Sequence, residues 1–563
     1  MRLRTGWRKG AAAAALFVVA ATAYAHDGAQ RFMVAAAHPL AVDAGVSVLK
    51  LGGTSVDAAV AVQLVLGLVE PESSGIGGGA FLLHWSEKER RVRSYDGREA
   101  APLAASADRF LRPDGMPMEF LEAAVGGRSV GVPGVIRLLE LAHLRHGRLR
   151  WAELFQYAIF AAEEGFVMTP RLHAALGRER FLRDDPAARR LYYGEDGRPK
   201  PVGARIVNPE YGATLRAIAF GGAEAFYFGE IAEDLVRAVR GHAKPGDLTL
   251  VDLARYRALE RKPVCARYRA QRVCGMGPPS SGGVTLLQIL GVLERTDFHR
   301  AAPNSARAAH LFSEAGRLAY ADRARYIADP RYAPVPVAGL LEPAYLGARA
   351  KLIGERSMGT AQPGTPRGAL AWADAPDLAP TGTTHFSIVD SRGDAVAMTS
   401  SIETIFGSRI LVRGFLLNNQ LTDFAFEPES GGRPAANRVA PGKRPRSSMA
   451  PTLVLGPDGR LAMAIGSPGG PSIINYVAKT LVAALDWRLD LQSAIALPNL
   501  GSENGPTLIE RGSVYELLGR ELAARGHAVE VRPLASGLHG VERVRGGWRG
   551  GADPRREGVA RGD

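Results

Sequence analysis

Two helical patterns and a strand-like run follow one another near the start of the chain. Apolar residues recur at helical spacing over 38–53, up to a glycine pair, and over 54–71, where Thr54 or Ser55 would be the N-cap. The run "SSGIGGGAFLLHW" follows at 73–85. A dinucleotide-binding fingerprint has its glycines after a strand and before a helix. Because the order here is helix, glycines, strand, we reject that motif and expect close backbone packing.

Helical periodicity also dominates the middle of the chain. Residues 135–240 are mainly helical by period, 278–294 form a Gly/Ser turn entering a helix, and 305–330 form a long amphipathic helix. Residues 355–382 are rich in Pro, Gly and Ala, which predicts a mobile, exposed loop. Strand patterns then dominate over 383–467, and the sequence contains no internal repeat.

A β-hairpin is predicted directly after this loop. Alternation along the first strand places one set of side chains on a single face: Thr383, His385, Ser387 and Val389. The turn "SRGD" contains Gly393, which can adopt a positive φ. If the returning strand pairs around this turn, Ser401 lies opposite Thr383 and Glu403 projects from the same face.

The first residues predict export. The chain has 563 residues, of which 46% are hydrophobic, as in a globular protein with a sizeable core. Residues 1–25 combine a basic start, a short apolar run and a final Ala-Tyr-Ala, the pattern of a signal peptide cleaved after Ala25. The apolar run is too short for a comfortable transmembrane anchor. We therefore expect a periplasmic or secreted protein with no stable membrane anchor.

Charge and cysteine content narrow the classes of function. Loss of the four basic residues of the signal peptide lowers the formal charge from +13 to +9, and the remaining surplus is scattered rather than interleaved with aromatics. Nucleic-acid binding is therefore not expected. Cys265 and Cys274 flank a short turn between two β-like runs, which favours a disulfide over free thiols in an oxidising compartment. Two cysteines are too few for a structural zinc site.

Thr383 is a candidate nucleophile. A threonine hydroxyl needs a base, and no Ser-His-Asp arrangement is evident in the sequence. If the chain were cut before Thr383, its own α-amine, with a reference pKa of roughly 7.7–8.0, could be that base. Gly382 suits such a cut because a residue without Cβ tolerates strained backbone. Taken alone, a Thr-Thr pair more often simply begins a strand.

Other polar positions could complete a site. The stretch "GFLLNNQLTDF" carries Gln420 and Asp423 after an apolar strand, and "KRPRSSMAPTLVL" places Ser447 and Ser448 before another strand. A glycine pair in "LAMAIGSPGGPSIINY" lies between a strand and a helix. Backbone N–H groups at a helix start would suit a developing oxyanion, although a plain tight turn is the alternative. A phosphate loop is disfavoured because no Gly-Lys-Ser/Thr follows.

Together these motifs resemble the γ-glutamyltranspeptidase family of the N-terminal-nucleophile hydrolase superfamily. The resemblance runs from about Met33 to "GGADPR" near the C-terminus, with its motifs in the family's order. These motifs are "GGTSVDAAVA", "GIGGGAFLL", "DGREAAP", "VGVPGV", "PPSSGG", "TGTTHFSIVD", "LLNNQLTDF", "RPRSSMAPT" and "GSPGG". The resemblance implies an α+β fold, a four-layer αββα sandwich, and no metal or organic cofactor.

The resemblance also implies a role for individual residues. Thr383 matches the nucleophile, which is released by autocatalytic cleavage of the Gly382–Thr383 bond. Ser401 matches a position, usually threonine, whose hydroxyl supports the nucleophile's amine. The other matches are Arg98 on the substrate α-carboxylate with Ser447 and Ser448, Gln420 and Asp423 near the α-amino group, and Gly469 and Gly470 in the oxyanion hole.

The sequence departs from the family pattern at two places. Glu403 stands where the best-known members have asparagine near the substrate amino group. The segment 424–442 is short and has no tyrosine, whereas several members have a longer loop there that forms a lid with an aromatic residue. We therefore expect a more open site.

The resemblance implies a precursor that matures into a large part, 26–382, and a small part, 383–563, which remain interwoven as one structural unit. The enzyme would transfer the γ-glutamyl group of glutathione-like donors to water or to amino acid or peptide amines through a threonine ester. One alternative is a glutaryl or cephalosporin-type acylase of the same fold. The other is a non-catalytic protein that binds γ-glutamyl compounds, which would need no nucleophile.

Overall fold

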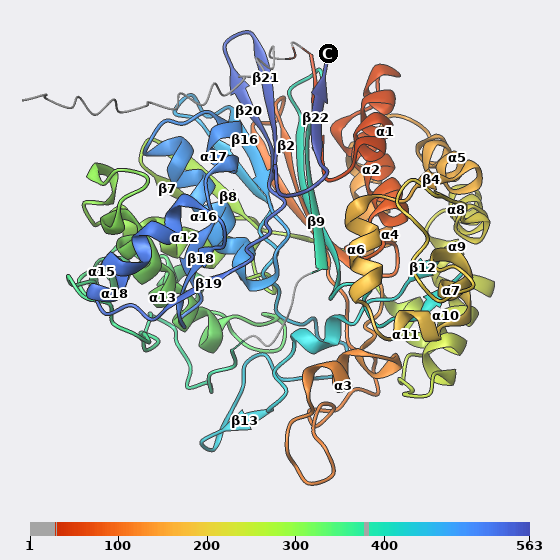
Figure 1. Ribbon diagram of the computed structural model, residues 1–563, viewed down its shortest axis with the longest axis horizontal. Helices are drawn as coiled ribbons and strands as arrows, with labels where there is room; N and C mark the ends of the chain where they lie inside the picture. Colours follow the sequence, from red (N-terminus) through yellow and green to blue (C-terminus); the bar gives the residue numbers. More distant parts are fainter. Residues whose placement is uncertain (1–28, 30, 377–381) are drawn as a thin grey trace, which may run out of the picture.

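The computed structural model describes residues 29, 31–376 and 382–563, which form a four-layer sandwich (Figure 1). Two antiparallel sheets face each other at the centre, and helices cover the outer side of each. The αββα architecture expected from the sequence is confirmed. The signal peptide expected over 1–25 lies outside the described residues and stays a prediction. Within the described part of the chain, no helix has the length and apolar character needed to cross a bilayer.

The first sheet has seven strands and contains the expected hairpin at its centre. In spatial order the strands are β22 (Val559–Gly562), β1 (Met33–Ala36), β9 (Gly382–Val389), β10 (Ala395–Glu403), β2 (Gly79–Ser86), β3 (Arg91–Gly97) and β6 (Leu259–Arg261). The expected alternation along β9 is confirmed, since Phe386 and Ile388 pack toward the helices and Val389 packs between the sheets. Thr383 is therefore on the side of β9 that faces the second sheet.

The second sheet has six strands and contains the disulfide. In spatial order the strands are β21 (Gly547–Ala552), β20 (His539–Val544), β16 (Leu461–Gly466), β15 (Thr452–Leu455), β8 (Gln271–Gly275) and β7 (Val264–Tyr268). The β7–β8 hairpin pairs Cys265 directly with Cys274, with their Cα atoms 4.1 Å apart, and a disulfide joins them. The disulfide favoured from the sequence is confirmed.

Helices α1 (Pro39–Lys50) and α2 (Ser55–Val69) lie on the outer side of the first sheet. Thr54 is the N-cap of α2, and a reciprocal pair of hydrogen bonds with Asp57 completes a capping box. Every residue of α2 is buried, which explains why its sequence is apolar on all sides. Between β3 and β6 the chain adds α3 (Phe120–Ala124), α4 (Val135–His146), α5 (Gln156–Glu164), α6 (Pro170–Arg178), α7 (Pro186–Tyr192), α8 (Pro209–Gly221), α9 (Glu224–Tyr227), α10 (Glu230–Gly241), α11 (Leu250–Arg255) and the short strands β4 (Phe166–Val167) and β5 (Arg205–Ile206).

The outer side of the second sheet is covered by α12 (Gly282–Leu293) and α16 (Ile473–Leu485), with α13 (Ala306–Tyr326) packed on α12. The expected Gly/Ser turn before α12 and the long helix after it are both confirmed. The remaining elements on this side are α14 (Val337–Leu340), α15 (Pro343–Ala350), α17 (Leu491–Ala496), α18 (Gly519–Ala524) and a small sheet of β17 (Leu500–Ser502), β18 (Thr507–Glu510) and β19 (Val529–Arg532).

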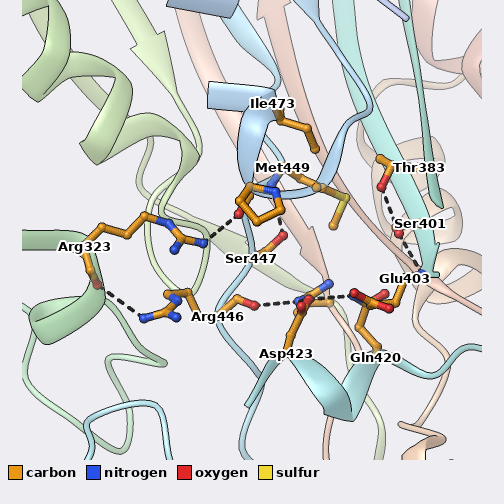
Figure 2. Close-up of a pocket in the computed structure, with 14 residues that line it drawn as sticks. Arg323, Thr383, Ser401, Glu403, Gln420, Asp423, Arg446, Ser447, Met449 and Ile473 are labelled. Atoms are coloured by element: carbon orange, nitrogen blue, oxygen red, sulfur yellow. Dashed lines mark hydrogen bonds and ion pairs between the residues drawn. The ribbon is translucent and has the colours of Figure 1, made fainter. Parts of the chain in front are cut away.

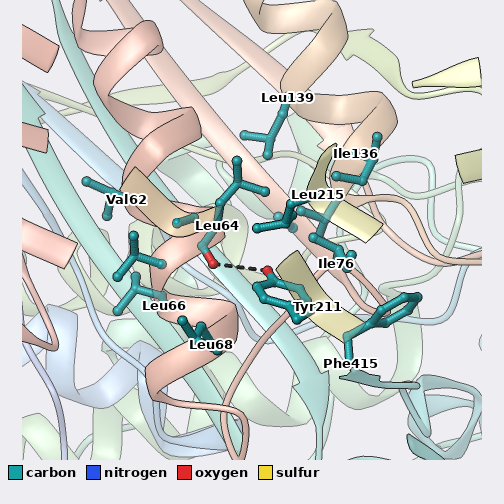
Figure 3. Close-up of a cluster of buried hydrophobic side chains, with 14 of the residues drawn as sticks. Val62, Leu64, Leu66, Leu68, Ile76, Ile136, Leu139, Tyr211, Leu215 and Phe415 are labelled. Carbon is teal, nitrogen blue, oxygen red and sulfur yellow. Dashed lines mark hydrogen bonds between the residues drawn. The ribbon is translucent and has the colours of Figure 1, made fainter. Parts of the chain in front are cut away.

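The hydrophobic core is divided by the first sheet. One part fills the space between that sheet and α2, α4 and α8, and the other fills the space between the sheets and beneath α12, α13 and α16. Figure 3 shows the first part, where Leu64, Leu139 and Leu215 converge from three helices. Tyr211 adds its ring there and donates its hydroxyl to the Leu64 carbonyl at 3.0 Å, so its buried polar atom is satisfied.

Both sheets combine strands from before and after the Gly382–Thr383 bond. In the first sheet β9 and β10 lie between β1 and β2, and in the second sheet β15 lies between β16 and β8. Residues 355–376 form no helix or strand, as expected, although β9 begins at Gly382 rather than after it. A cut before Thr383 would therefore leave two chains that share both sheets.

Candidate active site

The hairpin register brings Thr383 and Ser401 together. Gly393 has φ 81° in the turn, and Thr383 pairs with Ser401 across β9 and β10, as expected from the sequence. The two Oγ atoms are 3.2 Å apart (Figure 2). The Ser401 hydroxyl also donates to the Gly382 carbonyl at 2.7 Å. A Cβ on Gly382 would lie 2.6 Å from the Thr404 carbonyl carbon, so the packing requires glycine there. A hydroxyl donor thus polarises the carbonyl immediately before Thr383.

Thr383 lies at one end of a cavity between the ends of the two sheets (Figure 2). Of the residues expected in the site, all except Gly469 line this cavity, although they come from distant parts of the chain. The lining residues are Arg98, Arg323, Thr383, Ser401, Glu403, Gln420, Asp423, Arg446, Ser447, Ser448, Met449, Gly470, Pro471 and Ile473. The cavity is therefore rich in charged and hydroxyl groups, with few apolar walls.

Arg98 and Asp423 form an ion pair on the wall of the cavity. The Arg98 side chain is fully buried, and its guanidinium also donates to the backbone carbonyls of Pro445 and Arg446 at 3.2 and 2.7 Å. Gln420 donates its amide to Asp423 at 2.8 Å, while the Asp423 side chain remains 22% exposed. A cation and an anion held side by side match a ligand with a carboxylate and an ammonium on the same carbon.

Glu99 was not singled out in the sequence, although it belongs to the same "DGREAAP" motif as Arg98. Its carboxylate lies 3.6 Å from the Arg98 guanidinium and is completely buried. Burial raises the pKa of Glu99 to about 8, the nearby Arg98 opposes that rise, and Asp423 adds to it. Neither Glu99 carboxyl oxygen has a hydrogen-bond partner among the described residues. Glu99 thus lies next to the Arg98 guanidinium but does not itself line the cavity.

Glu403 lies in the cavity, on the face of the nucleophile, as expected. The strand register shifts between Ser401 and Glu403, and Glu403 has φ 84°, a left-handed conformation that non-glycine residues rarely adopt. Asn419 donates its amide to the Glu403 carboxyl at 2.9 Å. Burial, reinforced by Asp423, raises the pKa of Glu403 well above its ordinary value. A neutral Glu403 can donate a hydrogen bond but does not supply a negative charge.

The protonated state of Glu403 predicts an unusual dependence of stability on pH. Above about pH 4.5 this carboxyl ionises in the unfolded chain but keeps its proton in the folded protein, so wild-type stability falls as pH rises, by at most about 1.4 kcal/mol per unit. Glu403→Gln removes that loss. The thermal midpoint of the variant should therefore rise relative to wild type as the pH is raised above about 4.5. A difference that stays constant over this range, as expected for the exposed control Glu429→Gln, would contradict the protonated state.

Ser447 and Ser448 also line the cavity, together with two arginines that were not singled out in the sequence. Arg323, a buried residue of α13, donates to the Ser448 hydroxyl at 2.6 Å, and the Ser447 hydroxyl accepts from the Met449 N–H at 3.1 Å. Arg446 donates to the Ala375 carbonyl at 2.6 Å. The sequence offered Arg446 inside "KRPRSSMAPT", whereas Arg323 carried no local signal that its side chain would reach a cavity.

The glycine pair lies between β16 and α16. Gly469 and Gly470 have φ 136° and 57°, and Gly470 begins a short 3-10 helix that leads into α16. Gly470 lines the cavity, while a Cβ on Gly469 would lie 2.5 Å from the Tyr476 ring. Both positions need glycine because of their positive φ angles. Gly469 needs it also because a side chain there would overlap the Tyr476 ring. Their assignment to an oxyanion site stays a prediction.

The segment after Asp423 contains a small hairpin of β13 (Glu429–Ser430) and β14 (Arg433–Pro434), which extends away from the body of the protein (Figure 1). Glu429, Ser430 and Arg433 are exposed. None of the described cavity-lining residues comes from 424–442. The short pair β11 (Leu411–Val412) and β12 (Phe415–Leu416) precedes this segment and packs into the helical side of the core. These positions are compatible with the more open site expected from the sequence.

One buried group of metal-ligating side chains lies elsewhere, in the second helical layer. His310, Glu314 and His527 place one possible ligand atom each within 4.8 Å of one another. The two imidazoles hydrogen-bond each other at 2.8 Å, and the second nitrogen of His527 contacts Thr507 at 2.7 Å. Arg317 donates to Glu314 at 2.9 Å and brings a positive charge into the group. Hydrogen bonds and this cation account for the cluster as a structural network.

Comparison with known proteins supports one family. The family model for Gamma-glutamyltranspeptidase matches residues 41–562. The chain is 34% identical over 545 residues to the glutathione hydrolase proenzyme of Bacillus subtilis strain 168, covering 94% of this chain and 91% of that protein. It is 36% identical over 521 residues to the acylase ACY 1 proenzyme of Pseudomonas sp. strain V22, covering 91% and 89%.

The fold has close relatives among solved structures. Cephalosporin acylase from Bacillus halodurans superposes with a TM-score of 0.82 and 26% sequence identity, covering 95% of this chain and 96% of that chain. Two names, glutathione hydrolase and acylase, thus occur among proteins with this fold and similar sequences. The family match, the identity across more than nine tenths of the chain and the shared architecture agree: the chain belongs to the γ-glutamyltranspeptidase family.

Proposed function

We propose that this enzyme is made as a precursor, is cut before Thr383, and uses the new N-terminal threonine to transfer the γ-glutamyl group of glutathione-like donors. The observation that carries the proposal is Thr383, hydrogen-bonded to Ser401, beside the Arg98–Asp423 pair in one cavity. The products would be the parts 26–382 and 383–563, with the signal peptide removed during export to the periplasm or medium. The acyl group passes to water or to an amino acid or peptide amine.

Cleavage of the precursor is proposed to use the contacts around Gly382. Attack of the Thr383 hydroxyl on the preceding carbonyl breaks the Gly382–Thr383 C–N bond, forms an ester at Oγ and leaves a free α-amine on Thr383. Water then hydrolyses the ester. The Ser401 hydroxyl, which donates to the Gly382 carbonyl at 2.7 Å, stabilises the negative charge that develops on that oxygen. The freed amine becomes the base that activates Oγ toward substrate.

Donor binding is proposed to exchange one ion pair for two. The α-carboxylate of a γ-glutamyl donor binds Arg98 and its α-ammonium binds Asp423, so the substrate enters between groups that pair with each other in the free protein. Ser447 and Ser448 supply hydroxyls on the carboxylate side. The γ-carbonyl then lies toward Thr383, with the Gly470 region near its oxygen. A comparison of γ-glutamyl and glutaryl donors tests this arrangement.

An acylase that removes glutaryl side chains is the second candidate. The identity to the acylase ACY 1 proenzyme and the superposition on cephalosporin acylase favour it specifically. Glutaryl has the same carboxylate but lacks the α-ammonium. Asp423, which remains partly exposed in the cavity, favours the donor that carries the ammonium.

Ser401 variants are expected to separate the hydroxyl from the rest of the strand. Ser401→Ala should slow precursor cleavage by about 10²-fold, because a hydroxyl at the developing oxyanion on Gly382 is lost, and should also slow donor turnover, because Thr383 loses the hydroxyl that contacts its Oγ. Ser401→Thr should keep both within a few fold, since it retains the hydroxyl and favours a strand. Gel analysis of cleavage and steady-state kinetics measure the two effects. Rates for Ser401→Ala equal to wild type would remove Ser401 from the site.

A further inference from the structure

The start of β9 has a strand neighbour on one side only. β10 pairs with β9 as far as Gly382, whereas β1 pairs only with residues 386–389. If the chain is cut before Thr383, this residue becomes a chain end, and chain ends fray unless they are held. A reacting group must be held to well within about 1 Å, because a misplacement of that size can cost about 10²-fold in rate.

Arg556 reaches the open side of β9 from the C-terminal segment. Its guanidinium donates to the Thr383 carbonyl at 3.3 Å and to the Ser536 carbonyl at 3.0 Å. A Cβ on Gly537 would lie 2.6 Å from the Arg556 Nε, so that glycine leaves room for the guanidinium. Burial, reinforced by Arg171, lowers the pKa of Arg556 only to about 10, so the group is charged at neutral pH. Arg556 therefore supplies a donor where β1 supplies none.

Glu70 holds the next residue, Thr384, through its side chain. It follows α2 directly, is buried, and accepts a hydrogen bond from the Thr384 hydroxyl at 2.8 Å. Arg171 lies 3.5 Å from the Glu70 carboxylate and 3.1 Å from that of Glu72, which fixes the acidic pair in place. Glu70 thus binds the side chain of Thr384, and Arg556 binds the backbone carbonyl of the preceding residue, Thr383.

We propose that Arg556 and Glu70 are positioning residues that hold the Thr383–Thr384 segment in register after cleavage, so that the Thr383 hydroxyl and amine stay aimed into the cavity. This inference rests on the proposed function of Thr383. Neither residue lines the cavity among the described residues, so neither is expected to contact the donor. Their removal should lower kcat while leaving KM almost unchanged.

The first test compares Arg556→Ala with Arg549→Ala, a nearby arginine whose ion pair at 3.2 Å is with Glu542 on the neighbouring strand. With kcat normalised to the fraction of chain cut before Thr383, Arg556→Ala should lose about 10- to 100-fold and change KM less than about threefold. Guanidinium ion in the assay should restore part of that kcat. If the kcat of Arg556→Ala equals that of Arg549→Ala, the proposal is overturned. It is also overturned if kcat falls, guanidinium does not restore it, and the thermal midpoint of Arg556→Ala falls as well.

A second pair of variants decides the matter if Arg556→Ala does not accumulate as folded protein. Thr384→Val removes the hydroxyl that binds Glu70 and keeps the side-chain shape, whereas Thr384→Ser keeps the hydroxyl. We expect kcat to fall about tenfold in the valine variant and to stay within about twofold of wild type in the serine variant. Equal kcat values for the two variants would overturn the role of the Thr384–Glu70 contact.

Thr383→Ala separates failure of this inference from failure of the proposed function. If Thr383→Ala still turns over a γ-glutamyl donor, the proposed nucleophile itself is wrong. If Thr383→Ala is inactive while Arg556→Ala and Thr384→Val keep wild-type kcat, only the positioning role is wrong. The expected pattern is an inactive Thr383→Ala together with a selective loss of kcat in the other two variants.

Discussion

Thr383→Ala is expected to remain a single uncut chain after export, without measurable γ-glutamyl transfer, whereas wild type gives two fragments of which the smaller begins Thr383-Thr384-His385. The variant removes both the hydroxyl that attacks the Gly382 carbonyl and the nucleophile of the mature enzyme. We expect kcat/KM to fall at least about 10³-fold, as when the central nucleophile of a hydrolase is removed. A denaturing gel with N-terminal sequencing, followed by kinetics, measures the result.

The contacts around Gly382 give the reason for this large effect. In the precursor the Ser401 hydroxyl is within hydrogen-bonding distance of both the Thr383 hydroxyl, at 3.2 Å, and the Gly382 carbonyl oxygen, at 2.7 Å, so one side chain contacts the attacking residue and the carbonyl that it attacks. Thr384→Ser, which leaves Thr383 unchanged, is the control and should be cut like wild type. If Thr383→Ala is still cut at the same bond, cleavage is not autocatalytic and another agent must cut the precursor.

Local features of this site were predictable from the sequence because they depend on neighbouring residues. The alternation of β9 and a glycine in the turn determine the pairing of Thr383 with Ser401. The apolar α2 and the Cys265–Cys274 pair follow equally from short-range pattern and spacing. In each case the burial of a face or the geometry of a single turn allows only one local arrangement.

Tertiary features could not be derived from pattern alone. Arg98 and Asp423 are 325 residues apart, and only the resemblance to a family placed them in one site. Arg323 lies on α13, whose periodicity predicts a buried face. Whether an arginine on that face reaches the cavity depends on how α13 packs against the rest of the protein. Arg556 reaches β9 from the far end of the chain through a backbone carbonyl, a contact that leaves no side-chain signal in the sequence.

The hydrolysis of γ-glutamyl-p-nitroanilide is expected to exceed that of glutaryl-p-nitroanilide at least about tenfold in kcat/KM, the equivalent of about 1.4 kcal/mol. Arg98 can hold the carboxylate of either donor, so it does not discriminate. Asp423 can discriminate, because its carboxylate would lose its ammonium partner in the glutaryl complex while Arg98 turns toward the ligand. An unpaired, partly shielded charge costs at least about 1–3 kcal/mol.

Glu403 is expected to contribute less than Asp423 to this discrimination. Burial, reinforced by Asp423, raises the pKa of Glu403 well above its ordinary value and so favours its neutral form, whereas the Asp423 side chain remains partly exposed in the cavity. Asp423→Asn should therefore narrow the difference between the donors, mainly by slowing the γ-glutamyl reaction, and Arg98→Ala should slow both alike. Glu427→Gln, which changes an exposed acid just beyond Asp423, is the control and should alter neither donor. If wild type hydrolyses the glutaryl donor as well as or better than the γ-glutamyl donor, Asp423 does not bind a substrate ammonium. The cavity is then better interpreted as that of an acylase.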